Sequence, residues 1–169
     1  DLAIKKLALQ GGAEVPFLRP IELSSDIAHR NDVVAHALNE IPGYDYVILL
    51  QPTSPLRKKE HIDSAINILR ITESDSIVSV LEERDPMFNY GENGLELINP
   101  GRFQDLNFDR ERLYKFNGCL AAVWWEILKE NDLFGDKIAF LEMSKEDSVQ
   151  VTSQSMVVEI NNKLLRDGE

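Results

Sequence analysis

The sequence predicts a single α/β domain with a mostly parallel sheet that carries helices on both faces. A continuous apolar run of strand length occurs at 46–50, which is typical of a parallel strand buried on both faces, and the next strand is expected at 76–81. An amphipathic helical pattern over 59–72 separates them, so the three segments form a βαβ unit. The run at 46–50 is expected to be a central strand. A chain of 169 residues is long enough for one domain with its own core, which we expect to span 1–169.

The other elements follow from apolar spacing and from the residues that end each run. A short helix is expected near the start of the chain, stopped by Gly11-Gly12, and a second over about 28–41, stopped by Pro42-Gly43. The stretch Glu14–Pro20 contains two prolines and is expected to be an extended loop or edge. Later in the chain we expect a strand at 119–123, a short helix at 124–129, a strand at 137–143 and a helix at 153–165.

A β-hairpin is expected after the strand at 76–81. Residues 88–90 and 95–98 flank Asn93-Gly94, a pair that favours a type I′ turn between two antiparallel strands. The following segment, 100–116, is polar, rich in arginine and poorly periodic, so it is expected to be a loop or an arm.

Charge and composition exclude several classes of function. The net charge of −11 opposes binding to a nucleic-acid backbone, which requires clustered Lys and Arg. No apolar run approaches the roughly 20 residues needed to span a bilayer, so we expect no membrane partner and a cytoplasmic location. The one cysteine, Cys119, lies in an apolar segment and is expected to be a buried structural thiol. A solvated or helix-capping role is expected for His29, His36 and His61. Trp124 and Trp125 are expected in the core and an interface.

The polar loop Gln51–Arg57 follows directly on the strand at 46–50. Ligands of open α/β sheets bind at the carboxyl ends of strands, which makes this loop a candidate binding site. Its prolines restrict the backbone, while its amide, hydroxyls and guanidinium can bind hydroxyl and carboxylate groups of a small molecule. The alternative is a structural turn in which Ser54 caps the next helix, Pro55 takes its first position and Arg57 is solvated.

Five segments form a series along the chain: Gly12–Pro20, Leu49–Arg57, Asp75–Val80, Arg102–Leu106 and Asn117-Gly118. In order and spacing they resemble the acylneuraminate cytidylyltransferase family, also called the CMP-sialic acid synthetases. The most specific of them contains the string Gln-Pro-Thr-Ser-Pro-Leu-Arg. The resemblance extends over nearly the whole chain, to about Ser148.

This resemblance implies a Rossmann-like nucleotidyltransferase fold and a particular reaction. Family members transfer a cytidylyl group from CTP to the anomeric hydroxyl of a nine-carbon keto-sugar acid of the sialic acid type, and they release pyrophosphate with Mg²⁺ as the cofactor. The resemblance implies CTP, such a sugar acid and Mg²⁺ for this chain. It also implies a homodimer, with 87–116 as a hairpin and dimerisation arm.

The resemblance assigns substrate contacts to individual positions, but it identifies no catalytic residue. Arg19 is expected to help bind the nucleotide and Gln51 to contact the sugar acid, while Thr53 and Ser54 shape the same pocket. For Arg19 and Arg102 the alternative is a surface ion pair in an acidic protein. The residues expected near the sugar are Arg102 and Gln104.

The chain departs from the family pattern at the metal site. Two aspartates that hold Mg²⁺ in the family align with Gln150 and Thr152, whose neutral oxygens are weak substitutes for carboxylates. Glu146 and Asp147 are close in sequence, but a slip of one or two residues moves a side chain to another face or depth. The sequence therefore predicts no metal ligand at the aligned positions.

Other departures affect the nucleotide side. The family opens with a strand and a loop rich in Gly, Ser, Arg and Lys that cradles the CTP phosphates, and the sequence does not contain this first βαβ segment. A family serine aligns with Arg30, which would block the cytosine pocket or add a phosphate contact. A family tyrosine aligns with Ala121, so its hydroxyl is lost.

Three functions remain open from the sequence. The first is a CMP-sugar synthetase with an altered metal site. The second is a catalytically impaired family member that acts as a sugar-binding or dimeric regulatory module, which Gln150 and Thr152 favour. The third is a different nucleotidyltransferase or glycosyltransferase on the same fold, because fold does not determine chemistry.

Overall fold

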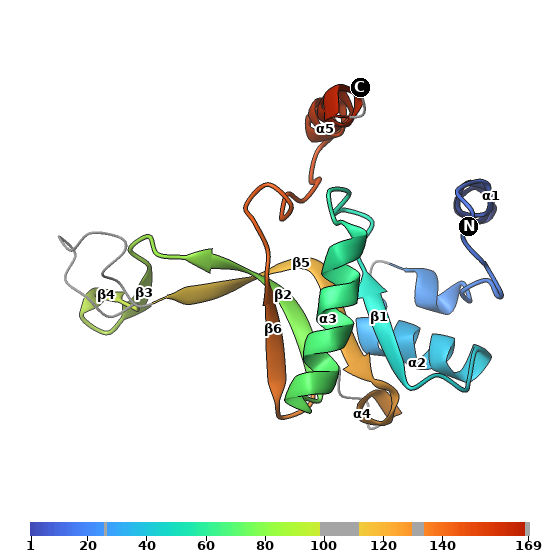
Figure 1. Ribbon diagram of the computed structural model, residues 1–169, viewed down its shortest axis with the longest axis horizontal. Coiled ribbons are helices and arrows are strands. Elements are labelled where there is room, and N and C mark those ends of the chain that lie inside the picture. Colours follow the sequence, from blue (N-terminus) through green and yellow to red (C-terminus); the bar gives the residue numbers. More distant parts are fainter. Residues whose placement is uncertain (26, 99–111, 130–133, 168–169) are drawn as a thin grey trace.

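The centre of the molecule is a mixed four-stranded sheet. The computed structural model describes residues 1–25, 27–98, 112–129 and 134–167. The strand order is β1 (Tyr46–Leu50), β5 (Leu113–Trp124), β2 (Ser76–Glu83) and β6 (Ile138–Glu142). The β2–β6 pairing is parallel, whereas β5 runs antiparallel to both β1 and β2. Three of the four strands therefore point in one direction and β5 in the other (Figure 1).

Helices cover both faces of this sheet, which confirms the predicted α/β class. Helix α3 (Lys59–Thr72) connects β1 to β2 and buries Ala65 and Leu69 against one face, in a core with Ile77 and Leu120. The other face is covered by α2 (Arg30–Glu40) and α4 (Trp125–Lys129). The second core contains Val34, Leu38, Val123, Trp125 and Leu128.

The position of β1 in the sheet differs from the expectation. Within the described sheet β1 pairs with β5 alone, so it is an edge strand and not a central one. An apolar run reports burial on both faces, which helices α3 and α2 provide at this edge, and it does not report the number of neighbouring strands. The β1–α3–β2 unit is also split, because β5 lies between its two strands.

Strand β5 begins earlier than predicted. Residues 113–116 were expected in a polar arm, but they belong to the strand and pair with the end of β2, beyond an irregularity between Val78 and Val80. Backbone pairing along an extended partner decides the extent of this strand, because side-chain polarity constrains only faces that are buried. The core segment of β5 is the apolar part that was predicted, and it contains Cys119, which is fully buried.

The predicted hairpin is present, with a different turn. Strands β3 (Phe88–Gly91) and β4 (Gly94–Leu97) pair in antiparallel register, and Gly91 lies opposite Gly94. The loop residues are therefore Glu92 and Asn93. Neither has a positive φ, which a type I′ turn requires, and Gly94 at φ 108° supplies the left-handed conformation instead. Figure 1 shows the hairpin projecting from one end of the sheet.

Two terminal helices lie away from the sheet in Figure 1. Helix α1 (Leu2–Gln10) is capped by the Asp1 side chain and ends at Gly11, and its four large apolar side chains are all exposed. Helix α5 (Gln154–Asp167) follows the last segment of the chain that contacts the sheet loops, and a short 3-10 helix spans Glu22–Ser24. Among the helices that the structure describes, none combines the length and the apolar content needed to cross a bilayer.

The end of α3 generates a stability prediction. Glu73 caps this helix with φ 49° and ψ 45°, a left-handed conformation that costs an L-residue about 1 kcal/mol and glycine nothing. We expect Glu73→Gly to raise the free energy of unfolding by about 0.5–1 kcal/mol, measured by urea unfolding. The matched control is Glu60→Gly, at an exposed position in the first turn of α3, which we expect to lower it by about 1 kcal/mol. Equal destabilisation by both changes would contradict the prediction.

Candidate ligand site at the carboxyl end of β1

A cavity of about 340 Å³ lies beside the carboxyl end of β1. It brings together Arg19 and Gln51, two of the residues that the sequence predicted to contact substrate. Both reach it from loops, and Gly118 of β5 contributes backbone. Its apolar wall is formed by Val33, Val34, Leu49, Leu50, Pro52, Phe116, Ala121 and Phe134.

Arg19 supplies the charge of the cavity. Its Nε donates to Ser24 Oγ at 3.3 Å, and that hydroxyl donates to the Pro20 carbonyl at 2.8 Å, so the turn after Pro20 orients the guanidinium. Of the described residues that line the cavity, Arg19 is the one with a charged side chain. In a site otherwise made of apolar groups and amides, this guanidinium favours an anionic or strongly polar ligand group.

The loop that carries Gln51 is fixed by Arg57. The Arg57 guanidinium donates from one nitrogen to the carbonyl of Cys119 at 2.7 Å and to that of Gln51 at 3.3 Å, which ties the loop to β5. Arg57 is half-buried, so the alternative of a solvated side chain is wrong. Arg57 therefore positions the loop. The sequence suggested that its guanidinium binds a ligand, but the guanidinium donates to two backbone carbonyls.

The structural alternative for Ser54 is also wrong. Helix α3 begins at Lys59, with Lys58 as its cap residue, four residues after Ser54. The Lys58 N–H donates to His61 Nδ1 at 3.1 Å, which confirms the capping role expected for His61. Ser54 is instead 1% exposed, and its hydroxyl has no hydrogen-bond partner among the described residues.

Thr53 and Ser54 shape the loop and do not line the cavity described above. The Thr53 side chain is exposed, while its carbonyl accepts from the Val151 N–H at 2.7 Å and joins the loop to the segment before α5. The Ser54 N–H donates to the Gln51 carbonyl at 3.2 Å and closes the turn that presents Gln51. The other two predicted sugar-site residues, Arg102 and Gln104, lie outside the described residues.

The Asn117-Gly118 stretch of β5, opposite the register shift in β2, is the best-connected part of the site. Asn117 Oδ1 accepts from Ser79 Oγ at 2.6 Å and from the Cys119 N–H at 3.1 Å, while Asn117 Nδ2 donates to Ser148 Oγ at 2.9 Å. Ser79 Oγ is also 3.0 Å from the Leu120 carbonyl and accepts from the Leu120 N–H at 2.8 Å. This buried network joins β5 to β2 and to the segment at 144–150.

The Gln150 side chain packs on the same stretch of β5. Its Nε2 donates to the Asn117 carbonyl, and the amide lies where a Cβ on Gly118 would be. Gly118 has φ 70°, so a larger residue there would be both strained and in collision with Gln150. Asn117-Gly118 was identified from the sequence as a motif, but its partners Ser79 and Gln150 were not. Ser79 could have been identified, because it is a polar residue between Val78 and Val80 of a predicted strand.

A second group of contacts joins the segment at 144–150 to the start of α3. Lys58 Nζ lies 2.9 Å from Asp147 Oδ1, and His61 Nε2 lies 3.6 Å from Asp147 Oδ2. Burial of the Asp147 carboxyl would raise its pKa, but hydrogen bonds with Lys58 and Ser144 and the charges of Lys58 and His61 outweigh burial and lower it. The hydrogen bond with Asp147, and then the Asp147 charge, raise the pKa of Lys58.

The side chains near the aligned metal positions do not fit Mg²⁺. Gln150 presents a donor to a backbone carbonyl, and Thr152 Oγ1 lies 3.4 Å from Met156 Sδ. Asp147, the nearby carboxylate that could have replaced the aspartates, is paired with Lys58. Within the described parts of the chain, no three His, Cys, Asp or Glu side chains are grouped so that they could hold a metal ion. Mg²⁺ sites in proteins rely on carboxylate oxygens, which this donor set does not offer.

Curated relatives of the chain carry names that agree with the resemblance. No family model matches the sequence. The chain is 33% identical over 139 residues to a CMP-N,N'-diacetyllegionaminic acid synthase of Legionella pneumophila, across 78% of this chain and 60% of the relative. It is 29% identical over 172 aligned positions to an N-acylneuraminate cytidylyltransferase of Streptococcus agalactiae, across 96% of this chain and 40% of the relative. An Escherichia coli protein with the latter name is 39% identical over 71 residues. These similarities agree with the resemblance recognised from the sequence.

The fold has a match among solved structures. A 4-diphosphocytidyl-2C-methyl-D-erythritol synthase from Anaerococcus prevotii superposes with a TM-score of 0.67, over 96% of this chain and 76% of that chain, at 13% identity. At this identity the likeness establishes the α/β fold and nothing about activity or substrates. The chain spans 60% of the Legionella relative and 40% of the Streptococcus relative.

The Asp147 contacts generate a pH-dependent prediction. We expect Asp147→Asn to lower the free energy of unfolding by about 1 kcal/mol at pH 7, because the variant loses a partly buried, hydrogen-bonded charge pair. The pKa of folded Asp147 is lowered, so its contribution is present above the unfolded value of about 3.9 and is lost as the pH falls through the folded value. Urea unfolding at pH 7 and near pH 2.5 measures the difference, which should shrink at the lower pH.

Asp63→Asn is the matched control for this experiment. Asp63 Oδ2 lies 3.8 Å from Lys59 Nζ, and the side chains are 56% and 83% exposed, so this pair is solvated. We expect a loss of less than about 0.5 kcal/mol at pH 7. An Asp147→Asn effect no larger than that of the control would show that the pair with Lys58 does not hold the segment at 144–150.

Proposed function

We propose that this chain, which is related to the acylneuraminate cytidylyltransferases, forms part of a protein that activates a nine-carbon keto-sugar acid with CTP. The anomeric hydroxyl oxygen would attack the α-phosphorus of CTP, the bond from that phosphorus to the bridging oxygen would break, and pyrophosphate would leave as the hydroxyl proton passes to solvent. The observation that carries the proposal is the meeting of Arg19 and Gln51 in one cavity at the carboxyl end of β1.

The size of the cavity suits part of the substrates, and its two polar side chains suit a contact with each of them. Its volume of about 340 Å³ is near the lower end of ligand pockets, which run from about 300 to 1,000 Å³. Arg19 suits contact with the nucleotide, because a guanidinium binds phosphate or a carbonyl-rich base edge. Gln51 suits a sugar hydroxyl or carboxylate, since its amide both donates and accepts. We assign these residues binding and orientation.

A second candidate function is a binding module without catalysis. Gln150 and Thr152 favour it, because the described donor set near them does not suit the Mg²⁺ that the family implies. Such a module would keep the cavity with Arg19 and Gln51 and bind the same ligands without releasing pyrophosphate.

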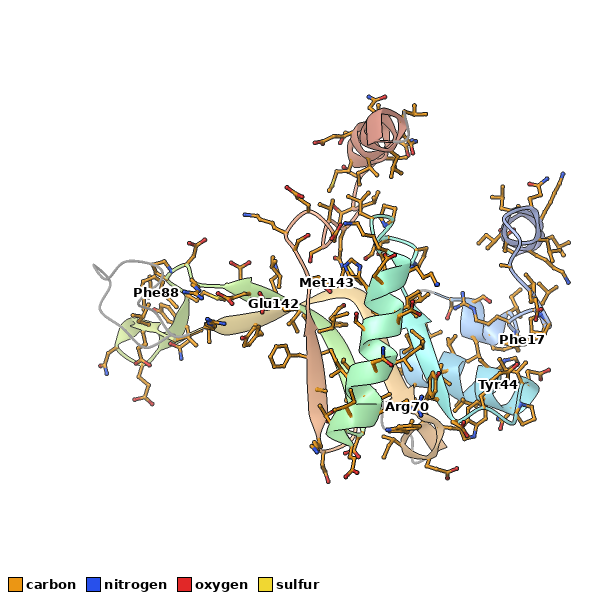
Figure 2. All side chains as sticks on the ribbon, viewed as in Figure 1. Phe17, Tyr44, Arg70, Phe88, Glu142 and Met143 are labelled. Atoms are coloured by element: carbon orange, nitrogen blue, oxygen red, sulfur yellow. The ribbon has the colours of Figure 1, made fainter. Side chains whose placement is uncertain are left out.

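A homodimer contact through the hairpin is part of the proposal. Tyr90 is 86% exposed and Leu95 is 72% exposed on strands that project from the sheet. Figure 2 places Phe88 on this hairpin, at the opposite end of the molecule from Tyr44. Exposed aromatic and aliphatic side chains on a projecting element favour contact with another protein surface.

Pyrophosphate release tests the two functions. We expect the full-length protein, incubated with CTP, Mg²⁺ and a panel of nine-carbon keto-sugar acids, to release pyrophosphate with at least one of them. Gln51→Ala should raise the KM for the sugar acid about 5- to 20-fold, the cost of one or two lost hydrogen bonds, and change the KM for CTP less. Arg19→Gln should raise the KM for CTP and change the KM for the sugar acid less.

Gln154→Ala, at an exposed position at the start of α5, is the control and should leave both KM values within twofold of wild type. Absence of pyrophosphate with every sugar acid, together with retained sugar-acid binding that Gln51→Ala weakens, would exclude the enzyme and support the binding module. Unchanged sugar-acid binding in Gln51→Ala would remove that residue from the site.

A further inference from the structure

We infer that Gln150 and Thr152 supply no ligand to a divalent cation, and that Gln150 instead acts as a positioning residue for the cavity. It would do so by holding the Asn117-Gly118 stretch of β5, whose Gly118 contributes backbone to the cavity wall. This inference rests on the proposed binding function only for its choice of ligand probe, while its statement about the cation stands on the contacts alone.

The Gln150 side chain is already engaged in contacts with β5. Its amide nitrogen donates to the Asn117 carbonyl, and its amide packs on the face of Gly118 where any other residue would carry a Cβ. An ion ligand in this position would direct an oxygen toward the site, whereas the contact seen directs a donor toward a backbone oxygen. The Gly118 conformation at φ 70° permits this close approach.

The oxygens of Thr152 and Asp147 are also engaged. Thr152 Oγ1 contacts Met156 Sδ, and Asp147 accepts from Lys58 Nζ while its own N–H donates to Ser144 Oγ. Removing Asp147 from Lys58 to bind a cation would leave the Lys58 charge without its partner.

Hydrogen bonds hold the same segment on both sides of Gln150. Ser148 Oγ accepts from Asn117 Nδ2 at 2.9 Å and donates to the Ser144 carbonyl at 2.7 Å. The Val151 N–H donates to the Thr53 carbonyl at 2.7 Å. Neutral hydrogen bonds therefore hold residues 144–151 against the Asn117-Gly118 stretch of β5 and against the loop that carries Gln51. A cation is not needed to bring these parts together.

Manganese titration tests the metal half of the inference. Mn²⁺ alone, followed by the electron paramagnetic resonance signal of the free ion, is added to the full-length wild type and to the variants Gln150→Ala and Thr152→Ala. We expect the dissociation constants of all three proteins to agree within twofold, whatever their absolute value. A fivefold or greater weakening in either variant would overturn the inference, because it would identify that side chain as a ligand.

Binding of CMP without metal tests the positioning half. Calorimetric titration in the presence of a chelator should show CMP affinity reduced at least fivefold in Gln150→Ala, with Gln154→Ala within twofold of wild type. Amide hydrogen exchange should accelerate at Gly118 in the first variant and not in the second. Unchanged CMP affinity and unchanged exchange in a folded Gln150→Ala protein would overturn this role.

The outcomes separate the inference from the proposed function. A protein that releases no pyrophosphate but shows the expected manganese and CMP results would refute the enzyme and leave the inference standing. A protein that releases pyrophosphate but loses Mn²⁺ affinity in Gln150→Ala would do the opposite.

Discussion

The site depends on the hydrogen bonds that converge on β5 at Asn117-Gly118-Cys119. Asn117 is 7% exposed, and an amide buried to this extent must have its donors and acceptors satisfied, since each unmet group costs about 1–3 kcal/mol. Its partners come from β2, through Ser79, and from the segment before α5, through Ser148. Arg57 brings the Gln51 loop to the carbonyl of Cys119, two residues after Asn117. One short stretch of strand therefore fixes the relative positions of three separate parts of the chain.

The sequence predicted the elements better than their arrangement. Helix α3 was expected at 59–72 and lies at Lys59–Thr72, because apolar spacing and local stop signals determine a helix within its own segment. The place of β1 at an edge and the insertion of β5 between β1 and β2 depend on long-range pairing, which no local pattern encodes. The same holds in the site. Arg19 and Gln51 were identified from motifs, but the use of Arg57 on two carbonyls and of Gln150 on Asn117 required the tertiary structure.

The departures from the family pattern lie in side chains, whereas backbone features of that pattern are present. The strand end before Gln51 and the positive φ of Gly118 are such backbone features. Gln150 and Thr152 stand where the resemblance predicts carboxylates. At Gln150, a neutral hydrogen bond to the Asn117 carbonyl holds the segment before α5 against β5 without a charged ligand set.

Charge in the cavity is set locally and not by the net charge of −11. Exposed charges more than about 8 Å apart are largely screened at physiological ionic strength, so the excess of acidic side chains elsewhere acts weakly on the cavity. Of the three cations around the loop, Lys58 is neutralised by Asp147 and Arg57 is engaged with two carbonyls. Arg19 donates to the uncharged Ser24 hydroxyl, and among the described residues no carboxylate forms an ion pair with it. The positive potential that an anionic ligand meets in the cavity therefore comes from Arg19, which lines it, and from the nearby Arg57, whose charge the two carbonyls do not cancel. Lys58 affects binding through the shape that it maintains.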